Sequence, residues 1–521
     1  MSEFSDKIIK MDRQKFQPAF LPKDRSTALL LPILIIGAII FAVGLTLLVL
    51  TDDSANPFKQ MYLLPWALMV GAVIAAPSVY LFYKGCFNLF HPLVFAAWSY
   101  FFPAFFLGSL ILASGLSQPY FLTFVEDERY NLPLTLVFVA LGYAGLTLGF
   151  YLPVGRNIGK KINARLPNPQ WETKQVIFPG LLLLAIGLTN VILGYIYGIL
   201  GYQRVDVIGA YDGLLFLLSL IWFEASFLLW LCIFRTKNLN VSHYLIIGLL
   251  IFLSLTKSAY QGNRGGIFQI CILIVCAFVF SGKQIQLKFR VLGGIALIFA
   301  VLVGIFYGTT FRTVKQSEAQ VGIEEYSEFI LSTFDKVLEQ DAGQSLEQGF
   351  KAMAERLDAV SSLAVVVSNY EKLAPFEESY GLDNNIRNDS IYFFIPRPLW
   401  LDKPVASDSH KYGDLYFNYS ENSFTITPMG DLLRNYGPIG VPLGMIFLGF
   451  VIRIFYTGLV ENQDFSFWRV TLFYMLLTSI SYESFYGTIT PYLIRVGFIS
   501  TVSLLLVWFF VKGKPKTYLN G

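Results

Sequence analysis

Repeated long apolar runs constrain this chain more than any other feature of its sequence. A transmembrane helix needs about 20 largely apolar residues, or fewer where the helix is broken or sheltered by protein. Such runs recur about twelve times and cover residues 27–50, 61–83, 92–113, 132–152, 176–200, 214–233, 244–256, 266–280, 291–307, 440–459, 467–482 and 491–511. This pattern predicts an all-α polytopic membrane protein with about 12 transmembrane helices.

The charge content fits a chain that meets lipid over much of its surface. Only 14% of the 521 residues are Asp, Glu, Lys or Arg, whereas a soluble domain carries about 25%. This deficit excludes an ordinary soluble protein. The net charge of +3 is close to balance and gives no reason to expect a nucleic-acid partner. Cys232, Cys271 and Cys276 lie in apolar runs, so neither disulfides nor a metal site is expected in the polar segments.

The distribution of Lys and Arg predicts the orientation of the spans. Basic residues gather in the segments that are cytoplasmic if the N-terminus lies inside, namely residues 1–26, 153–175, 234–243, 281–290 and 512–521. The short outer loops hold few, namely Lys59, Arg129, Arg204 and Arg264. This bias follows the positive-inside rule, and an even number of spans fits a basic tail at each end. Both termini are therefore predicted to be cytoplasmic.

One long polar interruption divides the apolar runs into two sets. The predicted organisation is a cytoplasmic segment at 1–26, spans one to nine within 27–307, an extracytoplasmic loop domain at 308–438, spans ten to twelve within 440–511, and a cytoplasmic tail at 512–521. An interruption of about 130 residues is long enough for a small folded domain. Apolar residues at helical spacing predict two amphipathic helices in it, across 326–338 and 346–367. After Pro375 the pattern predicts an ordered irregular loop.

Arginines on the predicted outer side are the first group that could bind a ligand. They are Arg264, Arg312, Arg356, Arg387, Arg397 and Arg434. A guanidinium presents a planar set of donors that suits phosphate oxygens. Arg264, Arg312 and Arg434 fall at the outer interface, where a lipid-linked diphosphate would lie. Each arginine has an alternative interpretation as a solvated charge or a structural ion pair, and Arg264, in a glycine-rich turn, as a side chain that snorkels to the headgroups.

Two residues on the predicted outer side are candidates for a catalytic base. His410 is the only histidine there, and histidine titrates near neutral pH, which suits proton transfer. Its alternative interpretation is a solvated loop residue. Asp431 precedes Arg434 in the segment that leads into span ten, so it is a candidate base, a partner of the arginine or a helix cap. The sequence leaves these alternatives open.

Other acidic residues could support such a site. Asp358 accompanies Arg356, and Glu483 lies near the outer end of span eleven. Glu224 lies inside span six, where an ionisable group is costly and indicates a function or a buried pair. Asp52 and Asp53 open the first outer loop, which is either an acidic pair of the kind that some membrane glycosyltransferases use or an ordinary loop start. With no nucleotide-binding glycine loop and no zinc-ligand spacing in the sequence, no cofactor and no metal are expected.

Three segments between Lys257 and Leu459 carry a likeness to a known family. They are Gly262-Asn263-Arg264-Gly265-Gly266 at the start of a span, Ile395-Pro396-Arg397-Pro398-Leu399-Trp400 followed by Asp402-Lys403-Pro404, and Thr427-Pro428-Met429-Gly430-Asp431 leading through Arg434-Asn435-Tyr436-Gly437 to Gly440. With these segments and its span layout, the chain resembles the O-antigen and exopolysaccharide repeat-unit polymerases, the Wzy-type family of bacterial inner membranes.

The resemblance implies a glycosyltransferase in the bacterial inner membrane. Such an enzyme transfers a growing oligosaccharide from undecaprenyl diphosphate onto the next lipid-linked repeat unit at the extracytoplasmic face. Its partners would be this glycolipid as donor and acceptor, membrane lipid, and a chain-length regulator. The arginines would stabilise the leaving diphosphate without a metal, and Asp431 or His410 would be the base.

Other functions fit parts of the same pattern. A flippase or transporter of lipid-linked oligosaccharide shares the spans and the arginines, although alternating access does not need a folded outer domain. Another lipid-dependent glycosyltransferase would use Asp52 and Asp53, and an O-antigen ligase would use an acceptor of the lipid A type. A structural assembly subunit is the remaining alternative.

Overall fold

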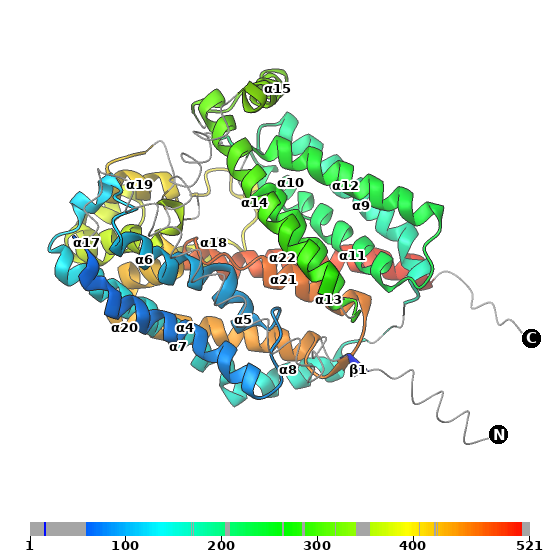
Figure 1. Ribbon diagram of the computed structural model, residues 1–521, viewed down its shortest axis with the longest axis horizontal. Helices are drawn as coiled ribbons and strands as arrows, with labels where there is room; N and C mark the ends of the chain where they lie inside the picture. Colours follow the sequence, from blue (N-terminus) through cyan, green and yellow to red (C-terminus); the bar gives the residue numbers. More distant parts are fainter. Residues whose placement is uncertain are drawn as a thin grey trace, which may run out of the picture.

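The computed structural model describes residues 15–16, 59–167, 169, 171–203, 209–262, 265–283, 287–317, 319–339, 355–405, 407–420, 424 and 426–512. Figure 1 shows a bundle of long helices with α17 and α19 gathered at its left end and α8 and β1 toward the lower right. The predicted first span at 27–50, the pair Asp52 and Asp53, Arg264, and residues 346–354 of the predicted helix at 346–367 lie outside the described residues.

The described elements are almost all helices. Before the predicted outer domain they are η1 (Met61–Leu63), α4 (Leu64–Tyr83), α5 (Pro92–Ala96), η2 (Ala97–Leu107), α6 (Gly108–Ala113), η3 (Tyr120–Phe124), α7 (Glu128–Tyr151), α8 (Pro153–Arg165), α9 (Thr173–Ile196), α10 (Asp212–Ser219), α11 (Ile221–Arg235), α12 (Val241–Gln261), α13 (Gly266–Phe280) and α14 (Leu287–Lys315). After α14 come α15 (Ile323–Glu339), α17 (Ala359–Tyr380), α18 (Asn385–Tyr392), η4 (Arg397–Leu399), α19 (Ser409–Phe417), α20 (Thr427–Leu459), α21 (Phe467–Thr478) and α22 (Tyr486–Lys512). The two short strands β1 (Lys15–Phe16) and β2 (Gln463–Asp464) pair antiparallel.

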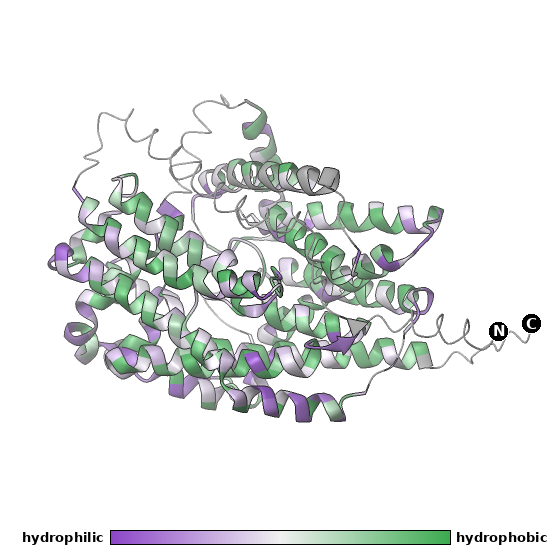
Figure 2. Cartoon of the chain, turned by 60° about the horizontal axis from the view of Figure 1, so that its bottom comes forward, coloured by the Kyte–Doolittle hydropathy of each residue, from purple (hydrophilic) through white to green (hydrophobic). Residues whose placement is uncertain are grey.

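Among the described residues, eight helices are long and apolar enough to cross a membrane. They are Met61–Tyr83, Pro92–Ala113, Glu128–Tyr151, Thr173–Ile196, Asp212–Arg235, Val241–Gln261, Thr427–Leu459 and Tyr486–Val511, and Gly266–Phe280 and Phe467–Thr478 are shorter apolar helices. Hydrophobic residues dominate the long helices and hydrophilic ones gather near their ends (Figure 2). The all-α class is thereby confirmed, whereas the count of twelve spans and the sidedness of the loops stay predictions.

Small residues allow the helices α7 and α20 to pack closely. A Cβ added to Gly149 would overlap the backbone oxygen of Ile446, and one added to Gly449 would overlap the backbone oxygen of Leu146. Packing of this kind is typical of helices in membranes, where lipid is as apolar as the side chains and close backbone approach supplies the attraction. The α7–α20 pair packs against α17 at the left end of Figure 1.

The segment predicted as one outer domain, 308–438, differs from the prediction in its limits and its local structure. α14 continues past residue 308 and α20 begins well before residue 438, because both helices extend beyond their apolar runs. The irregular loop predicted after Pro375 is largely helical, since α17 continues through that proline to Tyr380 and α18 and α19 follow. α15 packs on α14, whereas α17 packs on α7, α19 and α20.

Two features of the chain set the position of α17 and α20. Asp358 caps α17, with its Oδ1 accepting a hydrogen bond from Ser361 N at 3.0 Å, and the helix ends at Gly381 with φ 66°. α20 breaks at Gly437, whose φ of 68° and ψ of −168° only glycine adopts readily. The break separates a buried amino-terminal section, which carries Asp431 and Arg434, from the apolar remainder of the helix.

Candidate functional site

Arg434 lies at the centre of a buried polar cluster where α17, α18, α20 and α22 meet. We define this cluster as Glu377, Asn385, Asp431, Arg434 and Asn435. The Arg434 Nη1 donates to Glu377 Oε1 at 2.8 Å, and Nη2 donates to Asn385 Oδ1 at 2.8 Å and to Asp431 Oδ1 at 3.1 Å. The side chains of Asp431 and Arg434 have no exposed surface. One arginine is therefore balanced by two carboxylates inside the protein.

Asp431 fastens three elements to one another. Its carboxylate accepts hydrogen bonds from Asn385 Nδ2 on α18 at 3.0 and 3.2 Å and from the backbone nitrogen of Gly487 on α22 at 3.1 Å. The spacing of Asp431, Arg434 and Asn435 places all three on one face of α20. Of the three roles considered for Asp431, namely base, arginine partner and helix cap, the structure shows the ion pair with Arg434.

Glu377 completes the cluster from α17. Burial raises the pKa of Glu377, while the positive charge of Arg434 and the hydrogen bond from the Tyr416 hydroxyl oppose that rise. A buried ion pair of this kind is strongly destabilised when one partner is removed, because the remaining charge loses its compensation. The cluster accordingly connects α17, α18, α20 and α22 through hydrogen bonds, and its arginine is already engaged by protein carboxylates.

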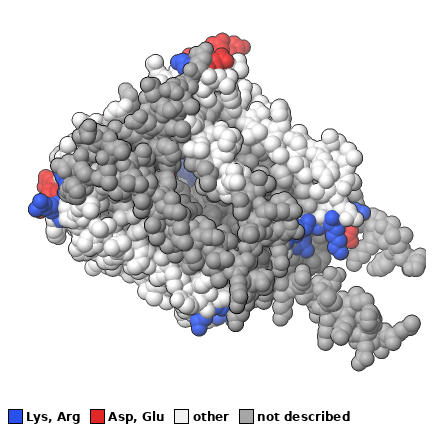
Figure 3. All heavy atoms as spheres, viewed as in Figure 1, with Lys and Arg blue, Asp and Glu red and all other residues white. Residues whose placement is uncertain are grey.

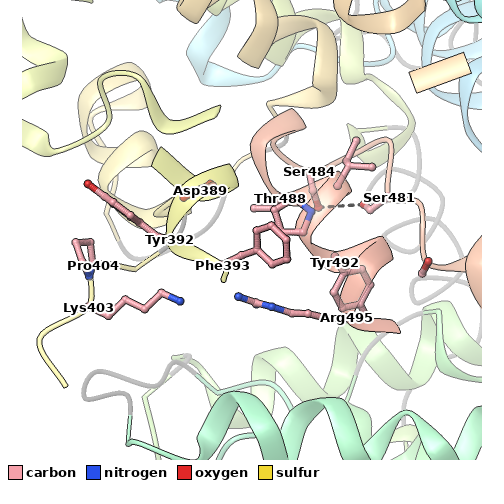
Figure 4. A pocket seen from close by; sticks show the side chains of 13 residues that line it. Asp389, Tyr392, Phe393, Lys403, Pro404, Ser481, Ser484, Thr488, Tyr492 and Arg495 are labelled. Carbon is pink, nitrogen blue, oxygen red and sulfur yellow. Dashed lines mark hydrogen bonds between the residues drawn. The ribbon is translucent and has the colours of Figure 1, made fainter. Parts of the chain in front are cut away.

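A pocket of about 270 Å³ lies beside the cluster. Its lining residues come from α18 and the loop after it, from the segment around Lys403, from the α21–α22 connection and from α22; they are Asp389, Tyr392, Phe393, Lys403, Pro404, Ser479, Ser481, Ser484, Thr488, Ile489, Pro491, Tyr492 and Arg495. The Lys403 and Arg495 side chains extend toward one another across it (Figure 4). Two positive charges that face each other make this pocket attractive to an anion.

Lys403 is held in a loop that its neighbours fix. Its Nζ donates to the backbone oxygen of Ile395 at 2.8 Å, and the rings of Tyr392 and Trp400 meet edge to face at 5.2 Å between centroids. Burial lowers the pKa of Lys403, and the positive charges of Arg495 and Arg397 lower it further. Both arginines thus lie close enough to repel the Lys403 ammonium, while the Asp389 carboxylate attracts it. A bound anion would relieve the repulsion.

Asp389 joins the pocket to the buried cluster. Its Oδ2 accepts a hydrogen bond from the Ser407 hydroxyl, and Asn385 Nδ2 donates to Ser407 Oγ at 2.9 Å as well as to Asp431. Burial raises the pKa of Asp389 to about 6; the negative charge of Asp431 acts in the same direction, and Ser407 and Arg495 oppose it. The pocket therefore contains one carboxylate of raised basicity beside two cations.

The other arginines predicted from the sequence do not line this pocket. Arg356 forms an exposed ion pair with Glu483 at 3.9 Å. Arg387 is exposed on α18, and the Arg312 guanidinium lies 4.7 Å from the ring centre of Tyr202, at the end of α14. Arg397 is half-buried in η4 and its Nη1 donates to the backbone oxygen of Leu401 at 3.4 Å, so it is the member of this set that approaches the Lys403 loop.

The remaining predicted acids and His410 have local partners. Asp358 accepts hydrogen bonds from Ser117 at 2.9 Å and from Ser361 at the start of α17. Glu224 is buried within α11 and accepts a hydrogen bond from the Ser503 hydroxyl on α22. His410 is half-buried on α19, with its Nδ1 2.9 Å from the backbone oxygen of Ser420.

The pocket contains residues that sequence reasoning missed. Arg495 lies inside the predicted twelfth span, so the rule that marks ionisable residues within a span, applied to Glu224, would also have found it. Lys403 belongs to a segment that carried the family likeness, but no role was predicted for it. Asp389 and Glu377 gave no sequence signal, because their importance arises from helices that pack together across long sequence separations.

The described part of the chain shows no candidate metal-binding site. In those residues no group of three or more His, Cys, Asp or Glu side chains could hold a metal ion.

On the face drawn in Figure 3, the coloured Lys, Arg, Asp and Glu side chains lie mostly at the margins of the described surface.

The pocket and the cluster both lie within the region of the chain that one family model matches. A family model described as a domain of unknown function (DUF8712) matches residues 91–513, which include every residue of both. No curated protein and no solved structure matches the chain. Because the matched region covers most of the 521 residues, the chain belongs to the DUF8712 family.

Proposed function

We propose that this protein is a membrane glycan polymerase. In the proposed reaction it transfers a growing undecaprenyl-diphosphate-linked oligosaccharide onto the next lipid-linked repeat unit at the extracytoplasmic face of the bacterial inner membrane. The single observation that carries the proposal is the pocket in which Lys403 and Arg495 face one another. The family likeness of the sequence supplies the reaction class.

The chemistry of the pocket suits a diphosphate group. An arginine can bind two phosphate oxygens at once through parallel hydrogen bonds, whereas a lysine contributes a compact charge. The volume of about 270 Å³ is slightly below the usual range for sites that hold a whole small molecule, about 300–1,000 Å³. The pocket therefore fits the head of a lipid-linked glycan, with the sugars and the isoprenoid chain outside it.

The surroundings of the cations favour an anion that carries an apolar chain. The loop that holds Lys403 and Arg397 exposes Phe394 at 72%, Leu399 at 80% and Leu401 at 67% of their surfaces. Exposed apolar side chains grouped beside a site mark contact with lipid or with an apolar partner. A soluble anion would leave these side chains in water, whereas a lipid-linked diphosphate would cover them.

The proposed catalysis is charge stabilisation at the departing group. As the acceptor hydroxyl attacks the anomeric carbon of the donor, the bond from that carbon to the diphosphate breaks and its electron pair stays on the diphosphate. Arg495 and Lys403, fixed in place before reaction, stabilise this developing charge. In contrast to the arginine-based expectation from the sequence, this role falls to Arg495 and Lys403 with Arg397 beside them, since Arg434 is engaged by Glu377 and Asp431.

Reconstitution tests the proposal directly. The full chain is placed in phosphatidylcholine vesicles together with glycolipid extracted from cells in which its gene has been deleted. Products longer than the input repeat unit support a polymerase. Translocation of the glycolipid without longer products would instead identify a flippase, and transfer onto an acceptor of the lipid A type would identify a ligase.

A matched pair of lysines makes the same assay specific for the pocket. Lys403→Ala should lower the rate of chain extension about tenfold or more, because a charge-assisted hydrogen bond contributes about 1.5–3 kcal/mol. Lys411→Ala removes an exposed lysine of α19 outside the pocket lining and should extend chains at the wild-type rate. Equal rates for both variants would refute the role of the pocket.

A further inference from the structure

Asp389 occupies a position in the pocket that the charge-stabilising role leaves unexplained. Among the described residues that line the pocket it is the only carboxylate, and 5% of its surface is exposed. Lys403 and Arg495, which would bind the leaving diphosphate, line the same pocket from other elements. A substrate whose diphosphate lies between the two cations would therefore bring its reacting carbon close to the Asp389 carboxylate.

We propose that Asp389 is the general base that takes the proton from the acceptor hydroxyl, an inference that rests on the function proposed above. The acceptor oxygen forms a new bond to the anomeric carbon of the donor. The bond from that carbon to the diphosphate oxygen breaks, and its electron pair leaves with the diphosphate. The hydroxyl proton passes to an Asp389 carboxylate oxygen and is released to water after the product departs.

The two bases expected from the sequence are less well placed than Asp389. Asp431 has no exposed side-chain surface, and its oxygens accept hydrogen bonds from Arg434, Asn385 and the Gly487 backbone. His410 lies on α19 with its Nδ1 beside the backbone oxygen of Ser420. Neither residue lines the pocket that holds Lys403 and Arg495.

The contacts of Asp389 orient it for such a role. Ser407 donates its hydroxyl hydrogen to Oδ2, and Ser407 is itself held by Asn385 of the buried cluster at 2.9 Å. α22 approaches so closely that a Cβ on Gly487 would lie 3.1 Å from Asp389 Oδ2. The carboxylate is therefore fixed by α18, α22 and the segment before α19, which is the kind of preorganisation that a catalytic group needs.

The charges around Asp389 come from each element packed against it. The negative charge of Asp431 on α20 raises the pKa of Asp389, whereas the positive charge of Arg495 on α22 lowers it. In the segment before α19, the Ser407 hydroxyl also lowers the pKa of Asp389, and Lys403 adds a positive charge. With a pKa of about 6, the carboxylate is ionised at neutral pH and more basic than a solvated aspartate. A bound diphosphate adds negative charge and shifts the pKa upward.

The test separates proton transfer from diphosphate binding. Vesicles that contain the full chain are assayed for chain extension with glycolipid from the deletion strain, and for binding of undecaprenyl diphosphate. Asp389→Asn should lower the rate of extension about 100- to 10,000-fold, the usual contribution of a general base, while binding undecaprenyl diphosphate at least as tightly as wild type. Asp389→Glu should restore part of the rate, with a shifted acidic limb of the pH profile.

Controls make each outcome decisive. Glu378→Gln makes the same carboxylate-to-amide change on the exposed side of α17 and should keep the wild-type rate. Extension by Asp389→Asn within about threefold of wild type, or a loss of undecaprenyl diphosphate binding in that variant, would overturn the assignment of the base while leaving the polymerase intact. Absence of longer products from the wild-type protein would overturn the proposed function and the base with it.

Discussion

Two arginines near the same end of the bundle show how the neighbouring charges decide what an arginine can do. Arg434 in the buried cluster contacts Glu377 and Asp431, and its side chain is fully buried. Arg495 in the pocket faces Lys403. The first guanidinium has its counter-charges within the protein, so it stabilises the fold. The second repels Lys403, and Asp389 balances only one of these two positive charges, so an anion from outside would complete the site.

Among the substitutions that test this comparison, Arg434→Ala should have the largest effect, a loss of stability. Two carboxylates would remain buried without their cation, which costs about 3–5 kcal/mol. We expect the variant to show a thermal unfolding midpoint well below that of wild type, measured in detergent by intrinsic fluorescence. Arg129→Ala, at an exposed position in the first turn of α7, is the control. A wild-type midpoint for Arg434→Ala would show that the cluster does not hold the helices together.

Asp389→Asn should stabilise the protein at neutral pH, whereas Arg434→Ala should destabilise it. Burial raises the pKa of Asp389 from its ordinary 3.8 to about 6, so between these values the folded state binds more protons than the unfolded state. Stability of the wild type therefore falls as pH rises through this window. At pH 7 the asparagine variant should be more stable, by up to about 3 kcal/mol at about 1.4 kcal/mol per pKa unit.

The pH series also supplies the internal check for Asp389→Asn. Its advantage in thermal midpoint should vanish as the pH falls well below the ordinary pKa of 3.8, where the wild-type carboxyl is protonated in both states. An advantage that stayed constant from pH 4 to pH 7 would mean that burial of the charge is not its origin.

Arg397→Ala should have the smallest effect of the three. The side chain is half-buried and hydrogen-bonds only weakly, at 3.4 Å to the Leu401 backbone oxygen, and it influences the pocket through its charge beside Lys403. Partly exposed charges contribute about 0–1 kcal/mol, which corresponds to at most about a fivefold weaker binding of undecaprenyl diphosphate. That loss should shrink in 0.5 M salt, measured with the same vesicles, since salt screens exposed charges.

Sequence patterns predicted the helices well because a lipid environment demands long apolar runs. The runs from 61–83 to 491–511 all coincide with helices of the structure. The start of α20 escaped prediction because Asp431 and Arg434 look like loop residues until Glu377 and Asn385 are seen to satisfy them. Tertiary pairing, which no local pattern records, makes that polar section a helix.

The candidate site was predicted only in part, for a related reason. A pairing of Asp431 with Arg434 was one of the alternatives that the sequence left open, and the two side chains do form an ion pair. The sequence suggested that Arg434 binds the diphosphate, but it gave no sign that Glu377 on α17 forms an ion pair with Arg434. Lys403 and Arg495 come from segments far apart in the sequence, and only the packing of α18 against α22 brings their surroundings together.

The most direct test of the central proposal is the affinity of the reconstituted protein for undecaprenyl diphosphate, compared between wild type and Arg495→Ala. We predict that the substitution weakens binding about 10- to 100-fold, as the loss of charge-assisted hydrogen bonds implies, while the thermal unfolding midpoint changes little. Equal affinities for the two proteins, or an equal affinity of wild type for uncharged undecaprenol, would contradict the assignment of the pocket to a lipid-linked diphosphate.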